Sequence, residues 1–324
     1  MSTPKEIMKS PAFRYAEDVL SDKVMAPKTI KKQAGHFLDD LKRAEKGWKY
    51  TFDLGAGRLP VQFCEQFLLP TAGEYGSFKF LPWQEFVDCQ AFGWVNRDTG
   101  YRRYREVLEM VPRGNGKTAR NSGKMGHMST KGADFGAENY FCGNNGKQAK
   151  RFYMDFYRQM RHSPVLKKRL RLTRAYTEYE PESVVVEALG NDADVLDGLR
   201  PYYVVKDELE GERNFEQINQ LLRPMKKRKQ PMMWYTGTAG TVLDGPMVYH
   251  YNYAKRSSTA IRRSTSARSS GICRSSLRSI RSCRTKIPNI GRWPIPRSAR
   301  CWIWRICWTT GLAVSAARKS WRTL

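Results

Sequence analysis

The stretch PRGNGKT, residues 112–118, constrains the fold of this chain more than any other feature. It follows residues 101–111, which predict a strand, and it leads into residues 118–129, which predict a helix with small residues on one side. A glycine-rich turn between a strand and a helix points backbone N–H groups and the positive end of the helix dipole at one place, where phosphate binds. The common pattern G-x-x-x-x-G-K-[ST] has glycine where this chain has Val111. The stretch therefore predicts a phosphate loop of unusual form, with a basic turn that caps a helix as the alternative.

The residue types of this loop suit nucleotide phosphates. Gly114 and Gly116 allow the tight backbone, and Asn115 lies between them in the same predicted phosphate-binding turn. Lys117 supplies a positive charge for the β- and γ-phosphates, and Thr118 supplies a hydroxyl for Mg²⁺. The predicted ligands are therefore ATP and Mg²⁺.

A pair of acids ends a second predicted strand, in the sequence YYVVKDE at residues 202–208. ATP hydrolysis needs a carboxylate to hold Mg²⁺ and benefits from a second one that orients the attacking water. We assign the first role to Asp207 and the second, that of base, to Glu208. Lys206 interrupts the otherwise apolar strand. A solvated strand end is the alternative, but the pair follows the loop by about 90 residues, a normal separation for nucleotide-hydrolysing folds.

Strands and helices alternate from about residue 100 to residue 243. This alternation predicts an α/β fold with a mostly parallel central sheet flanked by helices, whose ligands bind at the carboxyl ends of the strands. Together with the phosphate loop, it predicts a P-loop NTPase. Upstream, residues 12–47 predict a helix, and Pro82 begins a buried helix. We divide the chain into an N-terminal helical segment, a P-loop ATPase domain and a basic tail, at residues 1–57, 58–253 and 254–324.

The net charge of +26 is unevenly distributed. Residues 245–324 hold 17 Lys or Arg and no Asp or Glu, which leaves 40 basic and 31 acidic side chains in residues 1–244. A mildly basic body suits a protein that meets DNA or RNA phosphates, with ordinary solubilising charge as the alternative.

The seven Cys form no C-x-x-C pair and do not cluster with the four His, so we expect free thiols and no zinc site. We also expect no secretory signal and no membrane span, because the sequence lacks the apolar segments that these require.

The tail differs in character from the rest of the chain. Residues 254–324 are rich in Ser and Arg, follow no amphipathic period, and contain five of the nine Trp and four of the seven Cys. Natural basic tails are usually rich in Lys, Gly and Pro and poor in Trp and Cys. We interpret this tail as irregular and either disordered or translated out of frame, and an Arg/Ser-rich nucleic-acid arm is the competing interpretation.

With the loop and the acid pair in place, the chain resembles the large terminase subunit of tailed bacteriophages, the ATPase that packages DNA. Phosphate loops of the form P-R-x-N-G-K-[ST], without the first glycine, are common in that family, so Val111 fits the resemblance. Further ordered motifs of the family are similar to four segments of this chain: LPWQ at 81–84, GNNGKQAK at 143–150, DVLDGLRPYYVVKDE at 194–208 and TGTAGT at 236–241. The resemblance covers roughly residues 12–253.

The resemblance implies roles for further residues. Gln84 is the expected reader of the adenine base. Thr236 and Thr238 belong to the expected coupling motif, which senses the γ-phosphate and relays to the parts that move DNA. Arg113 is an expected stabiliser of charge in the transition state, with a role in fixing the loop as the alternative. The family also implies a homo-oligomeric ring on the portal protein, a small terminase subunit and double-stranded DNA as partners, and the cytoplasm of a bacterial host.

We therefore expect the ATPase motor of a phage or prophage terminase, which couples ATP hydrolysis to packaging of double-stranded DNA into the procapsid. The family's nuclease domain holds two metal ions with several carboxylates, and no Asp or Glu follows Asp244, so we expect no nuclease activity from this chain. A helicase-like DNA translocase shares the loop and the acid pair, but it would need a second domain with arginine motifs. A truncated, non-enzymatic remnant that binds DNA by charge alone is the third possibility.

Overall fold

A seven-stranded sheet forms the centre of the computed structural model, which describes residues 3–69, 76, 78–190 and 198–255. The order of its strands is β3-β9-β8-β4-β7-β6-β5. The first five of these strands run parallel to one another, and β6 and β5 are antiparallel at one edge. The strands are β3 (Glu106–Met110), β4 (Glu138–Cys142), β5 (Arg171–Leu172), β6 (Tyr176–Tyr179), β7 (Val184–Leu189), β8 (Pro201–Lys206) and β9 (Met232–Gly237). This arrangement confirms the α/β fold with a mostly parallel sheet.

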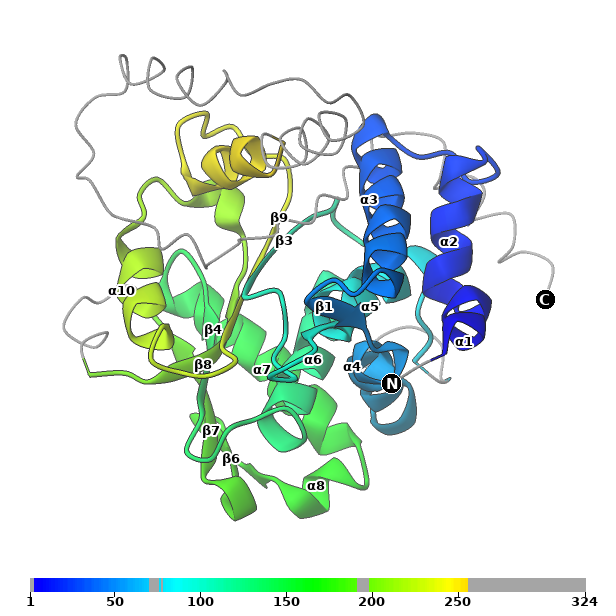
Figure 1. The fold of residues 1–324 in the computed structure, drawn as a ribbon. Helices are drawn as coiled ribbons and strands as arrows, with labels where there is room; N and C mark the ends of the chain where they lie inside the picture. Colours follow the sequence, from blue (N-terminus) through cyan, green and yellow to red (C-terminus); the bar gives the residue numbers. More distant parts are fainter. Residues whose placement is uncertain (1–2, 70–75, 77, 191–197, 256–324) are drawn as a thin grey trace.

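Helices cover both faces of the sheet (Figure 1). Alternate residues of a strand point to opposite faces, so Tyr203 and Val205 of β8 join the core beneath α6 and α7, while Val204 joins the core beneath α10. Because both faces are covered, every residue of β8 and β9 is buried, which explains why these strands appear as nearly continuous apolar runs in the sequence. The covering helices are α6 (Lys117–Thr130), α7 (Gly146–His162), α8 (Leu166–Arg169) and α10 (Glu216–Met225).

The N-terminal part packs onto the same core as α6 and α7. It contains a two-stranded antiparallel sheet and five helices among the described residues. These elements are α1 (Pro4–Lys9), α2 (Pro11–Leu20), α3 (Lys28–Glu45), β1 (Tyr50–Phe52), α4 (Leu54–Phe67), α5 (Pro82–Gly93) and β2 (Trp94–Asn96). The buried helix predicted to begin at Pro82 is α5, and the division between residues 57 and 58 falls within α4.

The prediction of one helix over residues 12–47 is wrong, because the structure has α2 and α3 with a break between them. Asp22 adopts a left-handed backbone with φ of 62°, which cannot continue an α-helix. Pro27 then precedes α3 as its N-cap, and proline disfavours the helical conformation in the residue before it. Helical spacing of apolar residues on both sides concealed this break in the sequence.

A helical segment at residues 246–255 ends the described part of the chain. The basic tail was predicted over residues 254–324, and residues 256–324 lie outside the part of the chain that the structure describes. No helix among the described residues has the length and apolar character needed to cross a membrane.

Candidate active site

The phosphate loop lies between β3 and α6, as the sequence predicts. Gly114 and Gly116 have φ values of 82° and 70°, a left-handed conformation that side chains with a Cβ rarely adopt. Gly116 is the N-cap residue of α6, so the free N–H groups of the first helical turn face the loop. The loop therefore has the backbone form that gathers N–H donors around an anion.

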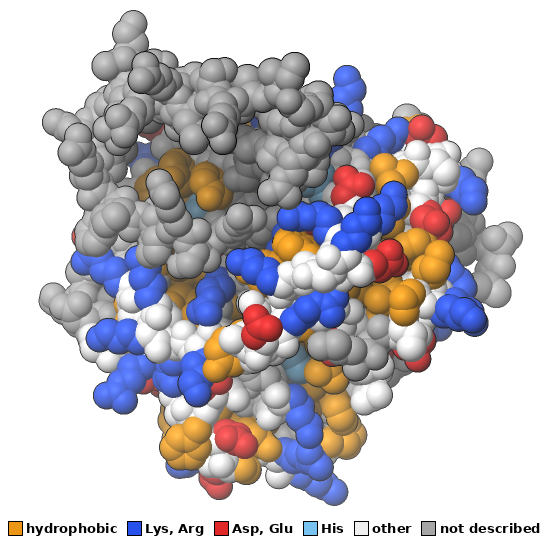
Figure 2. Space-filling model, viewed as in Figure 1, with side chains coloured by type: hydrophobic (Ala, Val, Ile, Leu, Met, Phe, Trp, Pro, Cys, Tyr) orange, Lys and Arg blue, Asp and Glu red, His pale blue; other side chains and the backbone are white. Residues whose placement is uncertain are grey.

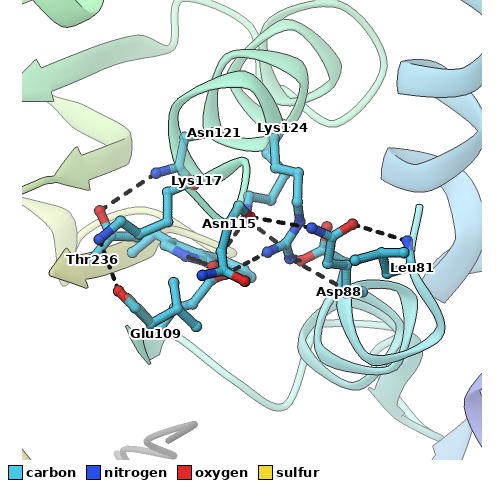
Figure 3. A network of polar contacts seen from close by, with 12 residues as sticks. Leu81, Asp88, Glu109, Asn115, Lys117, Asn121, Lys124 and Thr236 are labelled. Atoms are coloured by element: carbon cyan, nitrogen blue, oxygen red, sulfur yellow. Dashed lines mark hydrogen bonds and ion pairs between the residues drawn. The ribbon is translucent and has the colours of Figure 1, made fainter. Parts of the chain in front are cut away.

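Lys117 and Val111 close the loop on itself. The Lys117 Nζ donates a hydrogen bond of 3.0 Å to the carbonyl oxygen of Val111, and the Asn115 Nδ2 donates one of 3.1 Å to the carbonyl oxygen of Pro112. The backbone N–H of Val111 donates to the carbonyl oxygen of Gly237 at the end of β9. Figure 3 shows Lys117 and Asn115 between Thr236 on one side and Leu81 and Asp88 on the other. The loop is thus tied to β9, where the Thr/Gly turn begins.

The sheet order brings the acid pair next to this loop. β9 lies between β3 and β8, and the three strands are parallel. The phosphate loop follows β3, Thr236 lies near the end of β9, and Asp207 follows β8. The Asp207 Oδ1 accepts hydrogen bonds from the Thr236 Oγ1 at 2.5 Å and from the Glu208 backbone N–H at 2.9 Å. Burial raises the pKa of the Asp207 carboxyl above its usual value, although these two hydrogen bonds and the positive charge of Lys117 oppose the rise. Asp207 and Lys117 are therefore close enough to interact electrostatically.

Glu208 is held by two residues that sequence reasoning did not assign to the site. Its Oε2 accepts a hydrogen bond of 2.7 Å from the Gln148 Nε2, and its carbonyl oxygen accepts one of 3.0 Å from the Asn144 Nδ2. The backbone of Glu208 has φ of 54°, an uncommon conformation for a residue with a side chain. Gln148 and Asn144 lie in the segment 143–150 that carries part of the resemblance, and that position was the available signal for them.

Lys206 has a structural explanation in this strand. Its side chain is buried and forms an ion pair with Glu212, and its Nζ also donates hydrogen bonds to the Gly143 carbonyl oxygen at 2.9 Å and the Gln217 Oε1 at 2.7 Å. A buried ammonium is tolerated when its donors and its charge are satisfied in this way. Lys206 thereby connects the ends of β8 and β4 with α10, directly before the acid pair.

Gln84 is next to the phosphate loop, as its predicted role requires. Its Nε2 donates to the carbonyl oxygen of Asn115 at 3.2 Å, and its Oε1 accepts from the backbone N–H of Leu81 at 2.9 Å. An amide has two N–H donors and an oxygen with two lone pairs, so one donor and one acceptor position remain after these contacts.

The remaining predicted residues lie around this centre. Thr118 is partly exposed in the first turn of α6, and Arg113 is exposed in the loop. The Thr238 Oγ1 donates a hydrogen bond of 2.5 Å to the Glu210 Oε1, so this threonine contacts the turn after the acid pair and not the pair itself. The structure thus gathers Lys117, Asp207 and Thr236, with Glu208 adjacent.

This arrangement combines an anion-binding loop with hard oxygen ligands and a candidate base. The hydroxyl of Thr118 and the carboxylate of Asp207 are the ligand types that Mg²⁺ prefers. A bound cation would also offset the cost of ionising the buried Asp207. The residues present therefore fit Mg²⁺ together with a nucleoside triphosphate.

Comparison with known proteins gives one family match and likenesses to solved structures. A family model for the terminase large subunit, ATPase domain, matches residues 82–256. The crystal structure of the HK97 bacteriophage large terminase is similar with a TM-score of 0.54 and 17% identity, over 62% of this chain and 41% of that chain. The Thermus phage P74-26 large terminase ATPase domain is similar with a TM-score of 0.34 and 13% identity, over 44% of this chain and 61% of that chain.

The first likeness supports the fold alone, because the sequence identity is low. No curated protein matches the sequence. The matched part of this chain corresponds to less than two thirds of the length of each of these two solved structures.

Proposed function

This chain belongs to the terminase large subunit family through that family's ATPase domain, and on this premise we propose that it hydrolyses ATP to drive double-stranded DNA into a phage procapsid. The observation that carries the proposal is the gathering of Lys117, Asp207 and Thr236 at three adjacent strand ends, with Glu208 next to them. Phosphoryl transfer depends mainly on positioning and on neutralising charge, and these residue types at these places provide both.

Each site residue has a proposed part in hydrolysis. The N–H groups of the loop, from Gly114 to Thr118, bind the phosphates, and Lys117 exchanges its internal bond to Val111 for the β- and γ-phosphates. Thr118 and Asp207 would hold Mg²⁺, which would supply positive charge against the negative charge that develops on the phosphates. Glu208 accepts a proton from the attacking water, which requires its carboxylate to be free of Gln148 or to share that contact.

Three further residues act around this chemistry. Arg113 is exposed in the loop and is proposed to stabilise charge in the transition state. Gln84 is proposed to bind the adenine edge with its remaining donor and acceptor. Thr236 and Thr238 are proposed to couple the state of the nucleotide to movement of DNA, because they contact Asp207 and Glu210 respectively.

The proposed partners are double-stranded DNA, a small terminase subunit and the portal protein, with the chain in a homo-oligomeric ring in the cytoplasm of the bacterial host. Lys and Arg side chains are spread over the face shown in Figure 2, with Asp and Glu between them, and such a surface suits a polyanionic partner. The proposal is confined to the ATPase and includes no nuclease, because residues 245–324 contain no Asp or Glu to hold a pair of metal ions.

The Lys117→Ala substitution tests the proposal. Loss of the positive charge in the loop is expected to lower the Mg²⁺-dependent rate of ATP hydrolysis by about 10²-fold or more, in the range typical for loss of a charge-stabilising group. The matched control is Lys168→Ala, on the exposed side of α8, which should keep the wild-type rate.

A Lys117→Ala protein that hydrolyses ATP at the wild-type rate would contradict the proposal. Salt-sensitive DNA binding without any DNA-stimulated ATP hydrolysis in the wild type would favour the non-enzymatic DNA-binding alternative.

A further inference from the structure

Four charged side chains are buried directly behind the phosphate loop. Arg120 and Lys124 on α6 form ion pairs with Asp88 on α5 and Glu109 on β3, and all four side chains are at most 1% exposed. The Arg120 Nη2 lies 2.6 Å from the Asp88 Oδ1, and the Lys124 Nζ lies 3.4 Å from the same oxygen. The group contains two positive and two negative charges, so it is neutral as a whole.

The two acids of this group connect α6 to different parts of the fold. Glu109 faces the sheet: its Oε2 accepts a hydrogen bond of 3.1 Å from the Trp234 indole on β9. Although burial alone would raise the pKa of Glu109, Arg120 and Lys124 outweigh it and hold that pKa below its usual value. Asp88 lies on α5, so Asp88 alone of the two acids ties α6 to the helix that begins with the predicted base-reading segment.

Arg120 reaches that segment directly. Its guanidinium lies 5.4 Å from the centre of the Trp83 ring, and its Nη2 lies 3.5 Å from the carbonyl oxygen of Gln84. Asp88 follows Gln84 by four residues, so the two lie on the same side of α5, one turn apart. In Figure 3 Asp88 and Leu81 lie together on one side of the network, and Asn115 lies between them and Lys117. The same guanidinium therefore contacts two successive turns of α5, at Gln84 and at Asp88.

A buried ion pair of this kind adds little net stability, because the cost of removing both charges from water offsets most of their attraction. Its most direct consequence is a fixed geometry. A guanidinium can hold a carboxylate and a carbonyl oxygen at once in its planar fork, whereas an ammonium cannot reproduce that arrangement. Asp88 and Arg120 together therefore restrain α5 against the first turn of α6, which follows the phosphate loop.

We propose that Asp88 and Arg120 are positioning residues for the nucleotide base, which hold Gln84 at the height above the phosphate loop where its amide pairs with adenine. This inference rests on the proposed function, because it assumes that the loop binds a nucleoside triphosphate. Adenine presents a donor and an acceptor on its N6/N7 edge, while guanine presents two acceptors, so a correctly placed amide distinguishes the two bases. Displacement of Gln84 should therefore weaken selectivity for ATP over GTP.

The test compares two charge-balanced double variants of the full chain. Asp88→Ala with Lys124→Met removes the acceptor that Arg120 and Lys124 share on α5, and Glu109→Ala with Lys124→Met removes the acceptor on β3, while each leaves one buried acid opposite Arg120. The readout is the ratio of kcat/KM for ATP to kcat/KM for GTP. We expect the Asp88 variant to lose about tenfold in this ratio, the change that about 1.4 kcal/mol produces, through a higher KM for ATP, while the Glu109 variant stays within about twofold of the wild type.

If the Asp88 variant fails to fold by circular dichroism, Arg120→Lys takes its place, because lysine keeps the charge but loses the fork. Equal losses of selectivity in both double variants, or no loss in either, would overturn the inference. A wild-type chain that hydrolyses ATP and GTP equally would also overturn it, while leaving the proposed ATPase intact. A wild-type chain that neither binds nor hydrolyses ATP would overturn both, so the two failures are distinguishable.

Discussion

The carboxyl of Asp207 is buried against Thr236, and burial raises its pKa above the usual value of 3.8. An acid whose pKa is higher in the folded chain than in the unfolded chain stabilises the fold at low pH, and this contribution is lost as the pH rises through the folded pKa. Asn at this position cannot ionise but can still accept the same hydrogen bonds. We therefore expect Asp207→Asn to abolish Mg²⁺-dependent hydrolysis and to gain stability relative to the wild type as the pH rises.

Thermal unfolding of both chains without nucleotide, from about pH 3 to pH 7, measures this effect. The difference in Tm between the variant and the wild type should grow with pH. A constant difference across the range would show that the carboxyl of Asp207 ionises equally easily in the folded and unfolded chains.

Single residues also mark the limit of what the sequence predicts. Val111 departs from the common loop pattern, and its buried side chain and its backbone bond to Gly237 show that the position extends the contact with β9. Lys117 and Asp207 were predicted to serve one nucleotide site because ligands of a parallel sheet bind at the carboxyl ends of its strands. Gln148 was not assigned, because its bond to Glu208 joins residues 60 positions apart and no local pattern reports such a contact.

At the scale of elements, the close approach of α4 and α6 depends on glycine. A Cβ atom at Gly123 of α6 would lie 2.1 Å from the Cys64 Sγ of α4 and 2.9 Å from the Leu68 Cδ1. We expect Gly123→Ala to lower the free energy of unfolding by about 1–3 kcal/mol, the usual cost of adding a methyl group to a filled core. Urea unfolding followed by circular dichroism measures this change.

The control is Gly146→Ala in the first turn of α7, where a Cβ would meet nothing within 4 Å. That substitution should leave stability unchanged or raise it by up to about 1 kcal/mol, since it restricts the unfolded chain. Equal effects of the two substitutions would mean that α4 moves away from α6 without cost.

The alternation of strands and helices after residue 100 was predictable, because buried parallel strands and amphipathic helices have distinct apolar patterns. The antiparallel strands β5 and β6 were not predicted. They contain two and four residues, and their partly exposed side chains give no clear period of two. The break between α2 and α3 was missed for the opposite reason, since the apolar pattern on either side is strong while the break rests on the backbone of Asp22 and on Pro27.

At the scale of the whole molecule, the free energy of unfolding should depend on pH through two buried histidines. Burial lowers the pKa of His127 to about 3 and that of His250 to about 4, from 6.5 in an unfolded chain. As the pH falls below 6.5, the two histidines therefore gain a proton in the unfolded chain before they do so in the folded chain. The folded chain loses stability relative to the unfolded chain until the pH reaches the folded pKa values. Each histidine contributes a slope of up to about 1.4 kcal/mol per pH unit in this range.

The His127→Leu variant isolates one of the two. Its free energy of unfolding, measured with urea between about pH 6.5 and pH 5, should fall less steeply than that of the wild type by up to about 1.4 kcal/mol per pH unit. Parallel pH profiles for the two proteins would mean that His127 gains its proton as readily in the folded chain as in the unfolded one.

The place of β9 in the sheet has a consequence for biosynthesis. It is the last strand of the sheet in the sequence, yet it inserts between β3 and β8. The ribosome therefore delivers the phosphate loop and the acid pair well before the strand that joins them, and pairing over such long separations is slow compared with local folding. In a nascent chain that ends before residue 232, the phosphate loop and the acid pair are both present but the strand between them is not. We expect the two to form one site only after residues 232–237 have been synthesised.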